Sequence, residues 1–168
     1  MAIIGLGQAG SLPVEVHDQV AKVLSGSGRP LLAIPHGCPP TAFDRVVIAW
    51  RPGASAARAV HEALPLLARA EAIHVVCVDP HRGEGAHGED PGVDIARHLA
   101  RHGLQVTVHV EGADGDEPGA VVLRRCRELG ARLLVMGGYG HSRFREWVVG
   151  GTTRHVLGHA TLPVFLAH

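Results

Sequence analysis

The sequence predicts an α/β fold in which a doubly wound, parallel sheet carries helices on both faces. From residue 44 onward, short apolar runs rich in β-branched residues alternate with longer stretches whose apolar residues recur at helical spacing. The apolar runs are almost continuous, which is typical of strands that are covered on both faces. Strands separated by helices pair in parallel through right-handed crossovers. We therefore expect any ligand to bind outside the carboxyl ends of the strands, where the strand order reverses.

Size and composition narrow the class of protein. The chain has 168 residues, about one domain, and is 46% hydrophobic, enough to bury a core. Sixteen basic and sixteen acidic side chains leave a net charge of zero, which argues against nucleic acid or a membrane surface as the main partner. No apolar run reaches the roughly 18 residues of a membrane span, and the N-terminus does not resemble a signal peptide. Three scattered cysteines without a C-x-x-C pair favour a reducing compartment, so we expect a cytoplasmic protein.

The thirteen histidines raise the question of a metal site. His98 and His102 stand four residues apart on a predicted helix, a spacing that can hold a metal ion. No third acidic or cysteine ligand stands at a useful spacing. We therefore expect no metal of the protein's own.

The first strand of the alternating pattern is expected at residues 44–50, where DRVVIAW is apolar and β-branched. A helix follows over 55–70, with apolar residues on one face and charged residues on the other. Pro65 lies inside this helix and frees the carbonyl of His61 on the polar face, so it predicts a kink rather than a break. The second strand is expected at 72–79.

The middle of the chain continues the alternation. Residues 80–89 have turn composition and predict a loop. Asp90 followed by Pro91 predicts the N-cap and first turn of a helix that ends at Gly103. The third strand is expected at 104–110.

The last third of the chain holds two more helices and two more strands. Asp116 and Pro118 predict the start of the first helix, and Gly130 predicts its end. The remaining elements are expected at 131–137 (strand), 152–160 (helix) and 162–168 (strand).

The segment that joins the fourth strand to the last helix is rich in glycine. Gly137 is followed after two residues by Gly140, and after nine more by Gly150. Glycines bring bare backbone close to a ligand, and the helix that follows offers free N–H groups and a partial positive charge to a phosphate. Nearby side chains add donors: Thr152, Thr153, His141, Arg143, Arg145 and Arg154.

Two interpretations of this segment stay open from the spacing alone. One is a phosphate-binding loop. The other is a strand-to-helix turn that needs glycines, with its arginines on a solvated face. The segment matches neither the P-loop pattern G-x-x-x-x-G-K-[ST] nor the dinucleotide pattern G-x-G-x-x-G.

Residues 44–168 resemble a universal stress protein domain along nearly their full length. The hallmark of that family is G-x-x-G, nine residues and G-[ST] after a strand, then a helix and a terminal P-V strand. Here the pattern reads Gly137, Gly140, Gly150 and Pro163-Val164. The phrase GYGHSRFREWVVGG is most similar to the two-domain bacterial members. The resemblance implies a five-stranded parallel sheet of order 3-2-1-4-5, related to the adenine-nucleotide α-hydrolases, and often a dimer through the last strand.

The resemblance also implies that some members bind ATP between the ends of strands 1 and 4, while others bind no nucleotide. The residues that would bind ATP or another adenine nucleotide are Ala49, Arg51, Val78, Gly137, Gly140, His141, Arg143, Gly150, Gly151, Thr152 and Thr153.

This chain departs from the ATP-binding pattern in two places. The first strand of the family commonly ends in A-x-D-G-S, and here Arg51 stands where the acid is usual. It would either pair with a phosphate or fill the adenine slot. Gly151 replaces the usual serine or threonine, which removes one hydroxyl hydrogen bond, worth about 1 kcal/mol.

No catalytic arrangement accompanies the glycine-rich segment. Nothing matches G-x-S-x-G or a Ser-His-Asp set, and Cys77 lies on a predicted buried strand, where a thiol is usually inert. We expect a non-enzymatic stress-response or signalling module that hydrolyses ATP slowly at most. The alternative is an ATP-using enzyme of the adenine-nucleotide α-hydrolase type.

Residues 1–40 read as strand, helix and strand. With a shift of 133 residues, Pro30 falls on Pro163 and the run LLAI lies over VFLA. The segment is therefore interpreted as a half-repeat, the remnant of a first domain in a tandem-type member, ahead of the domain at 44–168. The alternative is an unrelated N-terminal extension.

The last strand would leave an exposed sheet edge, which proteins usually cover. We expect Leu31–Ile34 to pair antiparallel with Val164–Ala167, from the same chain or a neighbour, with a helix at about 14–25 over the remnant. A strand-helix-strand unit cannot bury its own core. We therefore predict a homodimer through the last-strand edge and residues 1–40.

Overall fold

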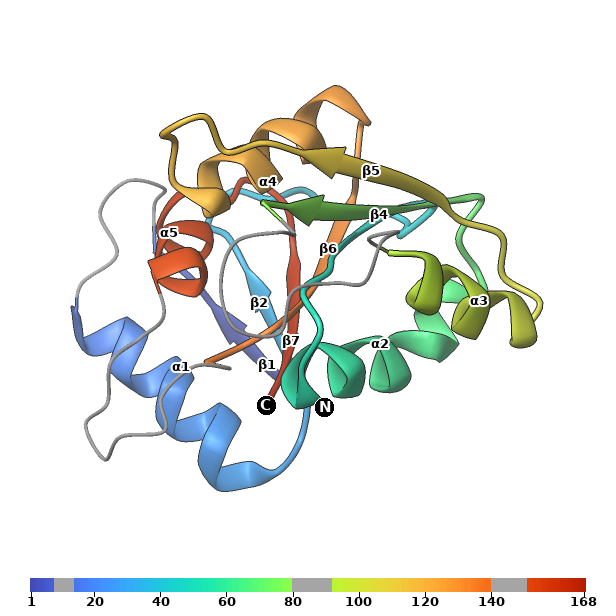
Figure 1. Ribbon diagram of the computed structural model, residues 1–168. Coiled ribbons are helices and arrows are strands. Elements are labelled where there is room, and N and C mark those ends of the chain that lie inside the picture. Colours follow the sequence, from blue (N-terminus) through green and yellow to red (C-terminus); the bar gives the residue numbers. More distant parts are fainter. Residues whose placement is uncertain (8–13, 80–91, 140–150) are drawn as a thin grey trace.

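The computed structural model describes residues 1–7, 14–79, 92–139 and 151–168 (Figure 1). Within them, seven strands form one sheet in the order β1-β2-β7-β6-β3-β4-β5. The strands are β1 (Ala2–Gly5), β2 (Leu31–Ile34), β3 (Arg45–Ala49), β4 (Ala72–Val78), β5 (Thr107–Glu111), β6 (Leu133–Gly137) and β7 (Val164–Ala167). The helices are α1 (Val14–Ser27), α2 (Ala54–Leu67), α3 (Val93–Arg101), α4 (Pro118–Glu128) and α5 (Gly151–His159).

The five strands after residue 44 confirm the predicted doubly wound α/β sheet. Their order in the sheet is β5-β4-β3-β6-β7, which is 3-2-1-4-5 when they are counted along the chain. All four pairings among them are parallel. The full sheet is wider than the expected five strands, because β2 and β1 extend it beyond β7.

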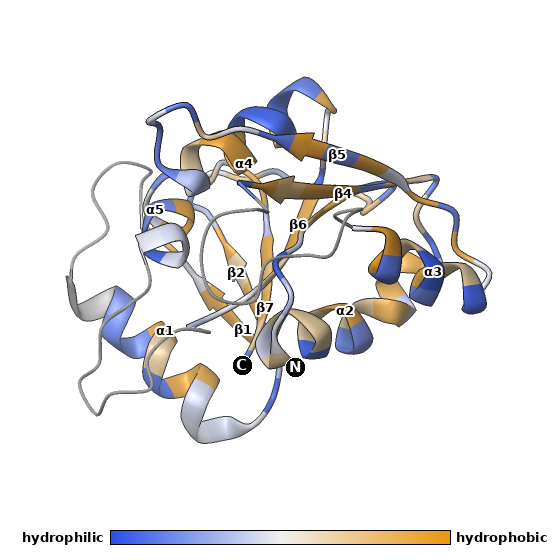
Figure 2. Ribbon diagram, viewed as in Figure 1, coloured by the Kyte–Doolittle hydropathy of each residue, from blue (hydrophilic) through white to orange (hydrophobic). Residues whose placement is uncertain are grey.

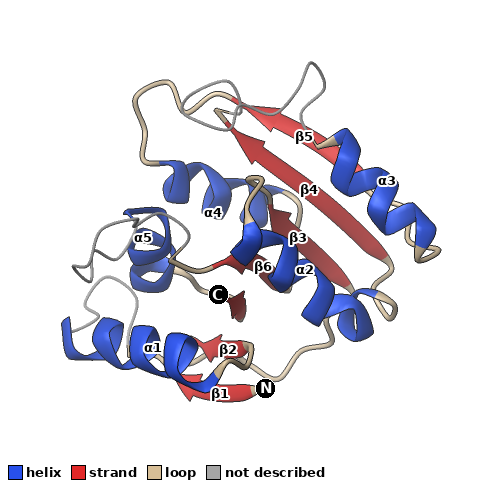
Figure 3. Ribbon diagram, turned by 60° about the horizontal axis from the view of Figure 1, so that its bottom comes forward, coloured by secondary structure: helices blue, strands red, loops and turns tan. Residues whose placement is uncertain are grey.

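Helices cover both faces of the sheet, as the continuous apolar strands predict (Figures 2 and 3). One face packs against α1, α4 and α5, whose core side chains include Leu24, Val122 and Val156. The other face packs against α2 and α3, through side chains such as Val60 and Leu99. The sheet is therefore buried between two helical layers.

The N-terminal segment joins the same sheet. β1 pairs parallel with β2, and β2 pairs antiparallel with β7, with Leu31 opposite Leu166 and Ala33 opposite Val164. The predicted antiparallel pairing is thus confirmed, and β2 comes from the same chain. As expected, a helix lies over this part of the sheet: α1 buries Leu24 in the core that Leu31 and Leu166 share. The last-strand edge is covered without a second copy.

Several predicted element boundaries differ from the structure; for example, the helix expected to run to residue 70 ends at Leu67. The helix expected to start at Asp90 and Pro91 starts later, at Val93, with Gly92 as its N-cap. Gly92 has a φ of 83°, and a Cβ there would stand 2.7 Å from Val108 Cγ1. This N-cap position requires glycine, because its backbone is left-handed and there is no room for a side chain beside β5. Residues 80–91, including the loop predicted at 80–89, lie outside the described residues.

Two further differences concern β5 and α4. The third strand begins at Thr107 rather than at residue 104, because Leu104 belongs to the turn that follows α3: its N–H donates to the carbonyl of Leu99. α4 starts at Pro118, as predicted, and its N-cap is Glu117 rather than Asp116. Asp116 pairs with Arg124 of the same helix at 3.4 Å. In contrast, α2 continues through Pro65, so the predicted helix is not broken there.

Candidate functional site

The carboxyl ends of three neighbouring strands meet at one edge of the sheet. Ala49, the last residue of β3, lies between Val76 of β4 and Met136 of β6 in the paired register. Val78 and Gly137 end those two flanking strands. The parallel pairing of the segments 44–50 and 131–137 is as predicted. It brings three of the predicted site residues, Ala49, Val78 and Gly137, to the same edge.

Arg51 stands just beyond this edge. The N–H of Trp50 donates to the carbonyl of Val76 at 2.9 Å, which continues the ladder by one residue past β3. The Trp50 side chain packs against the core, and Arg51 is exposed. Among the described residues, Arg51 makes no hydrogen bond or ion pair. No side chain among the described residues therefore occupies its guanidinium, which can bind a ligand anion.

The missing side chain of Gly137 makes room for a helix rather than for a ligand. A Cβ at this position would stand 2.6 Å from the backbone nitrogen of Ala56 and 2.8 Å from the carbonyl carbon of Ser55. Only glycine therefore allows the first turn of α2 to approach the end of β6 this closely. We expected this glycine to bring bare backbone close to a ligand. In the structure, the segment that approaches it is the first turn of α2.

The first turn of α5 contains Gly151, Thr152 and Thr153. Backbone N–H groups in such a turn have no partners within the helix and carry a partial positive charge. Thr153 is only 4% exposed and packs inward, whereas Thr152 is half-buried. Thr152 and the backbone of this turn are therefore more open to a phosphate than the Thr153 side chain is.

Four predicted site residues lie outside the described residues: Gly140, His141, Arg143 and Gly150.

Sequence reasoning missed Glu117, the N-cap residue of α4. Its carboxylate oxygens lie 3.5 and 3.6 Å from the point where a Cβ on Gly151 would stand. A negative charge here compensates the positive end of α5 and would repel a phosphate. The same charge acts on His155: burial lowers the pKa of that imidazole, and Glu117 opposes the shift. No local pattern links Glu117 to Gly151, because only the packing of α4 on α5 brings them together.

Asp79 is a second residue that the sequence analysis passed over. It follows β4 directly, with a φ of 43°, and its carboxylate accepts a hydrogen bond from the N–H of Ala113 at 3.0 Å. Its own N–H donates to the carbonyl of Glu111. The carboxylate is thus held at the same edge as Val78. An acid directly after a buried strand was the signal in the sequence.

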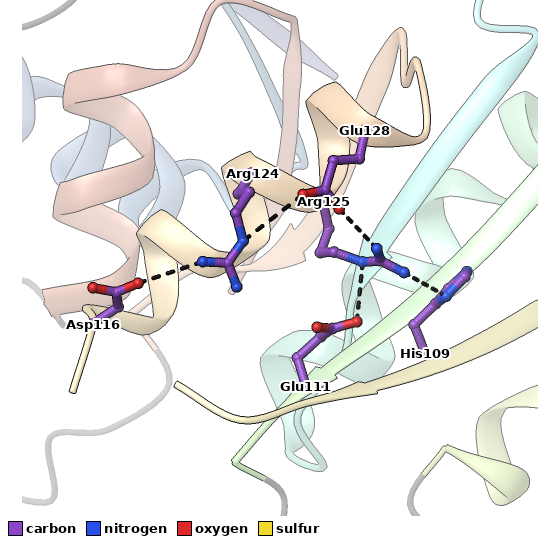
Figure 4. A network of polar contacts seen from close by, with 6 residues as sticks. All are labelled: His109, Glu111, Asp116, Arg124, Arg125 and Glu128. Atoms are coloured by element: carbon purple, nitrogen blue, oxygen red, sulfur yellow. Dashed lines mark hydrogen bonds and ion pairs between the residues drawn. The ribbon is translucent and has the colours of Figure 1, made fainter. Parts of the chain in front are cut away.

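A polar network joins α4 to β5 (Figure 4). The guanidinium of Arg125 pairs with Glu111 at 3.0 Å and with Glu128 at 2.7 Å. It also donates to Nδ1 of His109 at 2.8 Å, and Nε2 of His109 lies 3.2 Å from Nδ1 of His74. Because a guanidinium can only donate, neutral His109 carries its proton on Nε2 and donates it to His74.

Burial is the main cause that lowers the pKa of both imidazoles in this network. The charge of Arg125 lowers them further, as does His109 for His74. The network therefore favours two neutral histidines. Within the described residues there is no group of three metal-ligating side chains and no helix long and apolar enough to cross a membrane.

The two buried cysteines are packed in the core. Burial raises the pKa of the Cys77 thiol to about 11 and that of Cys126 to about 12. Such thiols stay protonated near neutral pH, and the thiolate is the reactive form. This agrees with the inert role expected for Cys77.

A model of the universal stress protein family matches residues 42–168. No curated protein sequence matches the chain. A solved universal stress protein from Archaeoglobus fulgidus DSM 4304 is 22% identical, with a TM-score of 0.68 over 99% of this chain and 60% of that one. A protein of unknown function from Pseudomonas aeruginosa PAO1 is 17% identical, with a TM-score of 0.64 over 99% of this chain and 62% of that one.

A third structure is a universal stress protein in complex with cAMP. It is 18% identical, with a TM-score of 0.55 over 76% of this chain and 99% of that one. The chain therefore spans about three-fifths of the length of the first two relatives and nearly all of the third. At these identities the likeness shows a shared fold.

Proposed function

This chain belongs to the universal stress protein family, and we propose that it is a non-enzymatic stress-response or signalling module that binds an adenine nucleotide. The observation that carries the proposal is the convergence of Ala49, Val78 and Gly137 at one carboxyl edge of the sheet. Open α/β sheets bind ligands at this kind of edge, where the strand order reverses. Here it reverses between β3 and β6, since β4 lies on the other side of β3. The relative that was solved with cAMP supports the same class of ligand.

The proposed nucleotide lies across the reversal point. Its base packs near Ala49 and Val78, which offer small and β-branched apolar surfaces. Its phosphate meets the first turn of α5, where Gly151 and Thr152 offer donors. α5 is the crossover between the parallel strands β6 and β7, so its N-terminus faces the carboxyl side of the sheet.

The test of this function is to identify and titrate the ligand. Protein purified gently and without dialysis is analysed by mass spectrometry for co-purified nucleotide, and ligand-free protein is then titrated with ATP, AMP and cAMP by calorimetry. Saturable binding of at least one of them is the expected result. Absence of both a co-purified nucleotide and any measurable binding would overturn the proposal.

Arg51 gives the sharpest test of how the ligand lies. Arg51→Asp restores the acid that is usual at this position in the family. If Arg51 fills the space of the nucleoside, this variant binds ATP more tightly; if Arg51 pairs with a phosphate, it binds more weakly. Arg69→Asp is the matched control, because Arg69 is exposed beyond the far end of α2. An Arg51→Asp variant that binds like the parent would remove Arg51 from the site.

The second candidate function is an ATP-using enzyme of the adenine-nucleotide α-hydrolase type. Steady-state turnover of ATP by the purified protein separates the two functions. We expect slow turnover or none, and about one turnover per second or more would favour the enzyme. We further propose that the protein acts in the cytoplasm, which fits its three free cysteines. Fractionation of cells that express the full chain tests this location.

A further inference from the structure

The chain leaves β6 underneath α1. The N–H of Gly138 donates to the carbonyl of Ala167 at 2.8 Å, which holds the residue beside β7. A Cβ on Gly138 would stand 2.6 Å from Cδ2 of Leu24 in α1. Leu24 is only 2% exposed, so its side chain has little room to turn away. The N-terminal helix thus fills the space that any side chain at position 138 would need.

The next residue touches the same helix. Tyr139 has a φ of 59°, a conformation that residues with a Cβ rarely adopt and that persists only where the surroundings hold it. Its half-buried ring packs against the core that contains Leu24, and its hydroxyl donates to the backbone carbonyl of His17 at 3.4 Å. Burial raises the pKa of this hydroxyl to about 12, so it remains a donor at neutral pH. The tyrosine is therefore held in place by α1.

A third link runs through the turn that ends α1. Arg58 of α2 donates to the carbonyl of Gly28 at 2.6 Å and to the carbonyl of His168 at 3.2 Å. The His168 ring lies with Nδ1 3.1 Å from the carbonyl of Gly138, so Nδ1 carries the proton and donates. The end of α1 and position 138 are thus connected through two side chains.

We propose that α1 positions residues 138 and 139, directly after the end of β6, so that the N-terminal segment sets the affinity of the nucleotide site. The proposal rests on the proposed function, because residues 138 and 139 directly follow Gly137, at the carboxyl ends of the strands where the nucleotide is proposed to bind. The coupling is reciprocal: if docking of α1 strengthens nucleotide binding, then nucleotide binding strengthens the docking of α1 by the same factor.

The experiment is a rescue in the full-length chain. Gly138→Ala introduces the Cβ that meets Leu24, and Ala itself is not strained there, since Gly138 does not have a left-handed φ. We expect the displacement of residues 138 and 139 to weaken nucleotide binding by about tenfold. Leu24→Ala in the same chain removes the atom that clashes, and the double variant should regain most of the lost affinity.

The matched control is Gly137→Ala. Its Cβ would meet the backbone of α2 rather than Leu24. Leu24→Ala should therefore not rescue Gly137→Ala. Binding is measured by calorimetry well below the unfolding temperature of each variant, so that a general loss of stability does not imitate a loss of affinity. Equal affinity of Gly138→Ala and the parent, or equal rescue of both glycine variants, would overturn the proposal.

A second measurement keeps the inference separate from the proposed function and covers a variant that fails to fold. In ligand-free protein, hydrogen exchange reports the opening of the Gly138 amide bond to Ala167. Leu24→Ala alone should speed exchange at 138 more than at the central amides of β3. If the parent binds no nucleotide but this local effect is present, the proposed function fails and the positioning stands. If exchange at 138 is unchanged, the positioning fails whatever the parent binds.

Discussion

At the scale of single residues, the candidate site differs from the family pattern in the sign of its charges. Arg51 stands where an acid is usual, and the carboxylate of Glu117 lies beside the first residue of α5. The positive charge of Arg51 therefore lies near the end of β3, and the negative charge of Glu117 lies at the N-terminus of α5, where we propose that the phosphates bind. We propose that this arrangement favours ligands that carry few phosphate charges over ATP.

Glu117→Gln tests this charge effect. Removing the carboxylate should tighten ATP binding by about two- to fivefold, the usual effect of one charge at a helix end, and tighten AMP binding less. The Glu117 side chain makes no capping hydrogen bond, so the stability of α4 should change little. Glu71→Gln is the control, because Glu71 is exposed and lies just before β4, at the amino ends of the strands. Calorimetric titration with both nucleotides decides, and weaker ATP binding by Glu117→Gln would contradict the idea.

The paired histidines predict how stability depends on pH. Burial and nearby positive charge lower the pKa of His74 and of His109 in the folded protein. Below the unfolded value of about 6.5, the unfolded chain takes up protons that the folded chain resists. The free energy of unfolding should therefore fall as the pH drops from 7 towards 5. Glu111, Glu128, Arg125 and Arg45 are the charged groups that surround the pair.

Urea unfolding at a series of pH values measures this dependence. His74→Gln should flatten the loss of stability between pH 7 and 5 relative to the parent, because one of the coupled imidazoles is gone. His61→Gln, exposed on α2, controls for the removal of a histidine. A slope in His74→Gln equal to that of the parent would show that the pair does not carry the pH dependence.

At the scale of elements, close helix packing depends on single glycines. Gly119 in the first turn of α4 faces α5, where a Cβ would stand 2.9 Å from Cβ of His155 and 3.0 Å from the carbonyl oxygen of Thr152. The latter is a backbone atom in the first turn of α5, so it cannot move without moving the helix. The approach of α4 to the proposed phosphate end therefore needs glycine at 119.

Gly119→Ala should destabilise the protein by about 1–3 kcal/mol, the usual cost of overpacking, and weaken nucleotide binding at the same time. Gly158→Ala in α5 is the control, since a Cβ there meets nothing within 4 Å. Alanine at 158 should stabilise the helix by up to about 1 kcal/mol. Thermal and urea unfolding measure both variants. Similar effects of the two substitutions would argue against a special contact at Gly119.

At the scale of the whole molecule, the N-terminal segment completes the sheet. β2 occupies the edge of β7, and Val20, Leu24, Leu31 and Ala33 share one core with Leu166. We propose that residues 1–40 are the remnant of a preceding domain of the same family. Two relatives that are longer than this chain align with 99% of it, N-terminal segment included, and they support this origin.

Removal of residues 1–40 should expose the β7 edge and the apolar residues beside it. Such edges pair with other chains, so we expect aggregation or a new assembly, measured by light scattering. A truncated protein that stays soluble, stable and monomeric would show that the segment is dispensable and that the half-repeat interpretation is wrong.

We also propose a homodimer to which residues 1–40 contribute. β2 of the same chain already pairs with β7. A second copy that leaves this pairing intact would therefore contact the edge strand β1, where Ile3 is 65% exposed. Ile3→Lys places a charge on that strand and should shift the protein towards monomer in sedimentation experiments. Val110→Lys, on the opposite edge strand β5, is the control and should leave the assembly unchanged. A parent that is monomeric at high concentration would contradict the dimer.

The sequence alone determined the doubly wound architecture, because strand runs and helical periodicity are local patterns and few topologies join them. The order 3-2-1-4-5 and the antiparallel pairing of Leu31–Ile34 followed from the family resemblance and the half-repeat, and the structure confirms both. The wrong helix start at Asp90 shows the limit of local reasoning. Asp-Pro is a good helix start by itself, but the packing of Gly92 against Val108 decides where α3 begins.

Only the tertiary structure decided which partners the glycines and charges have. The family spacing identified Gly137 as part of a ligand loop, whereas its missing side chain makes room for α2. Glu117 meets Gly151, and Leu24 meets Gly138, across long separations in the chain. Local propensity depends on a few neighbouring residues, so it predicts elements. Contacts between distant segments depend on how the helices pack on the sheet, and that packing determines the electrostatics and the shape of the candidate site.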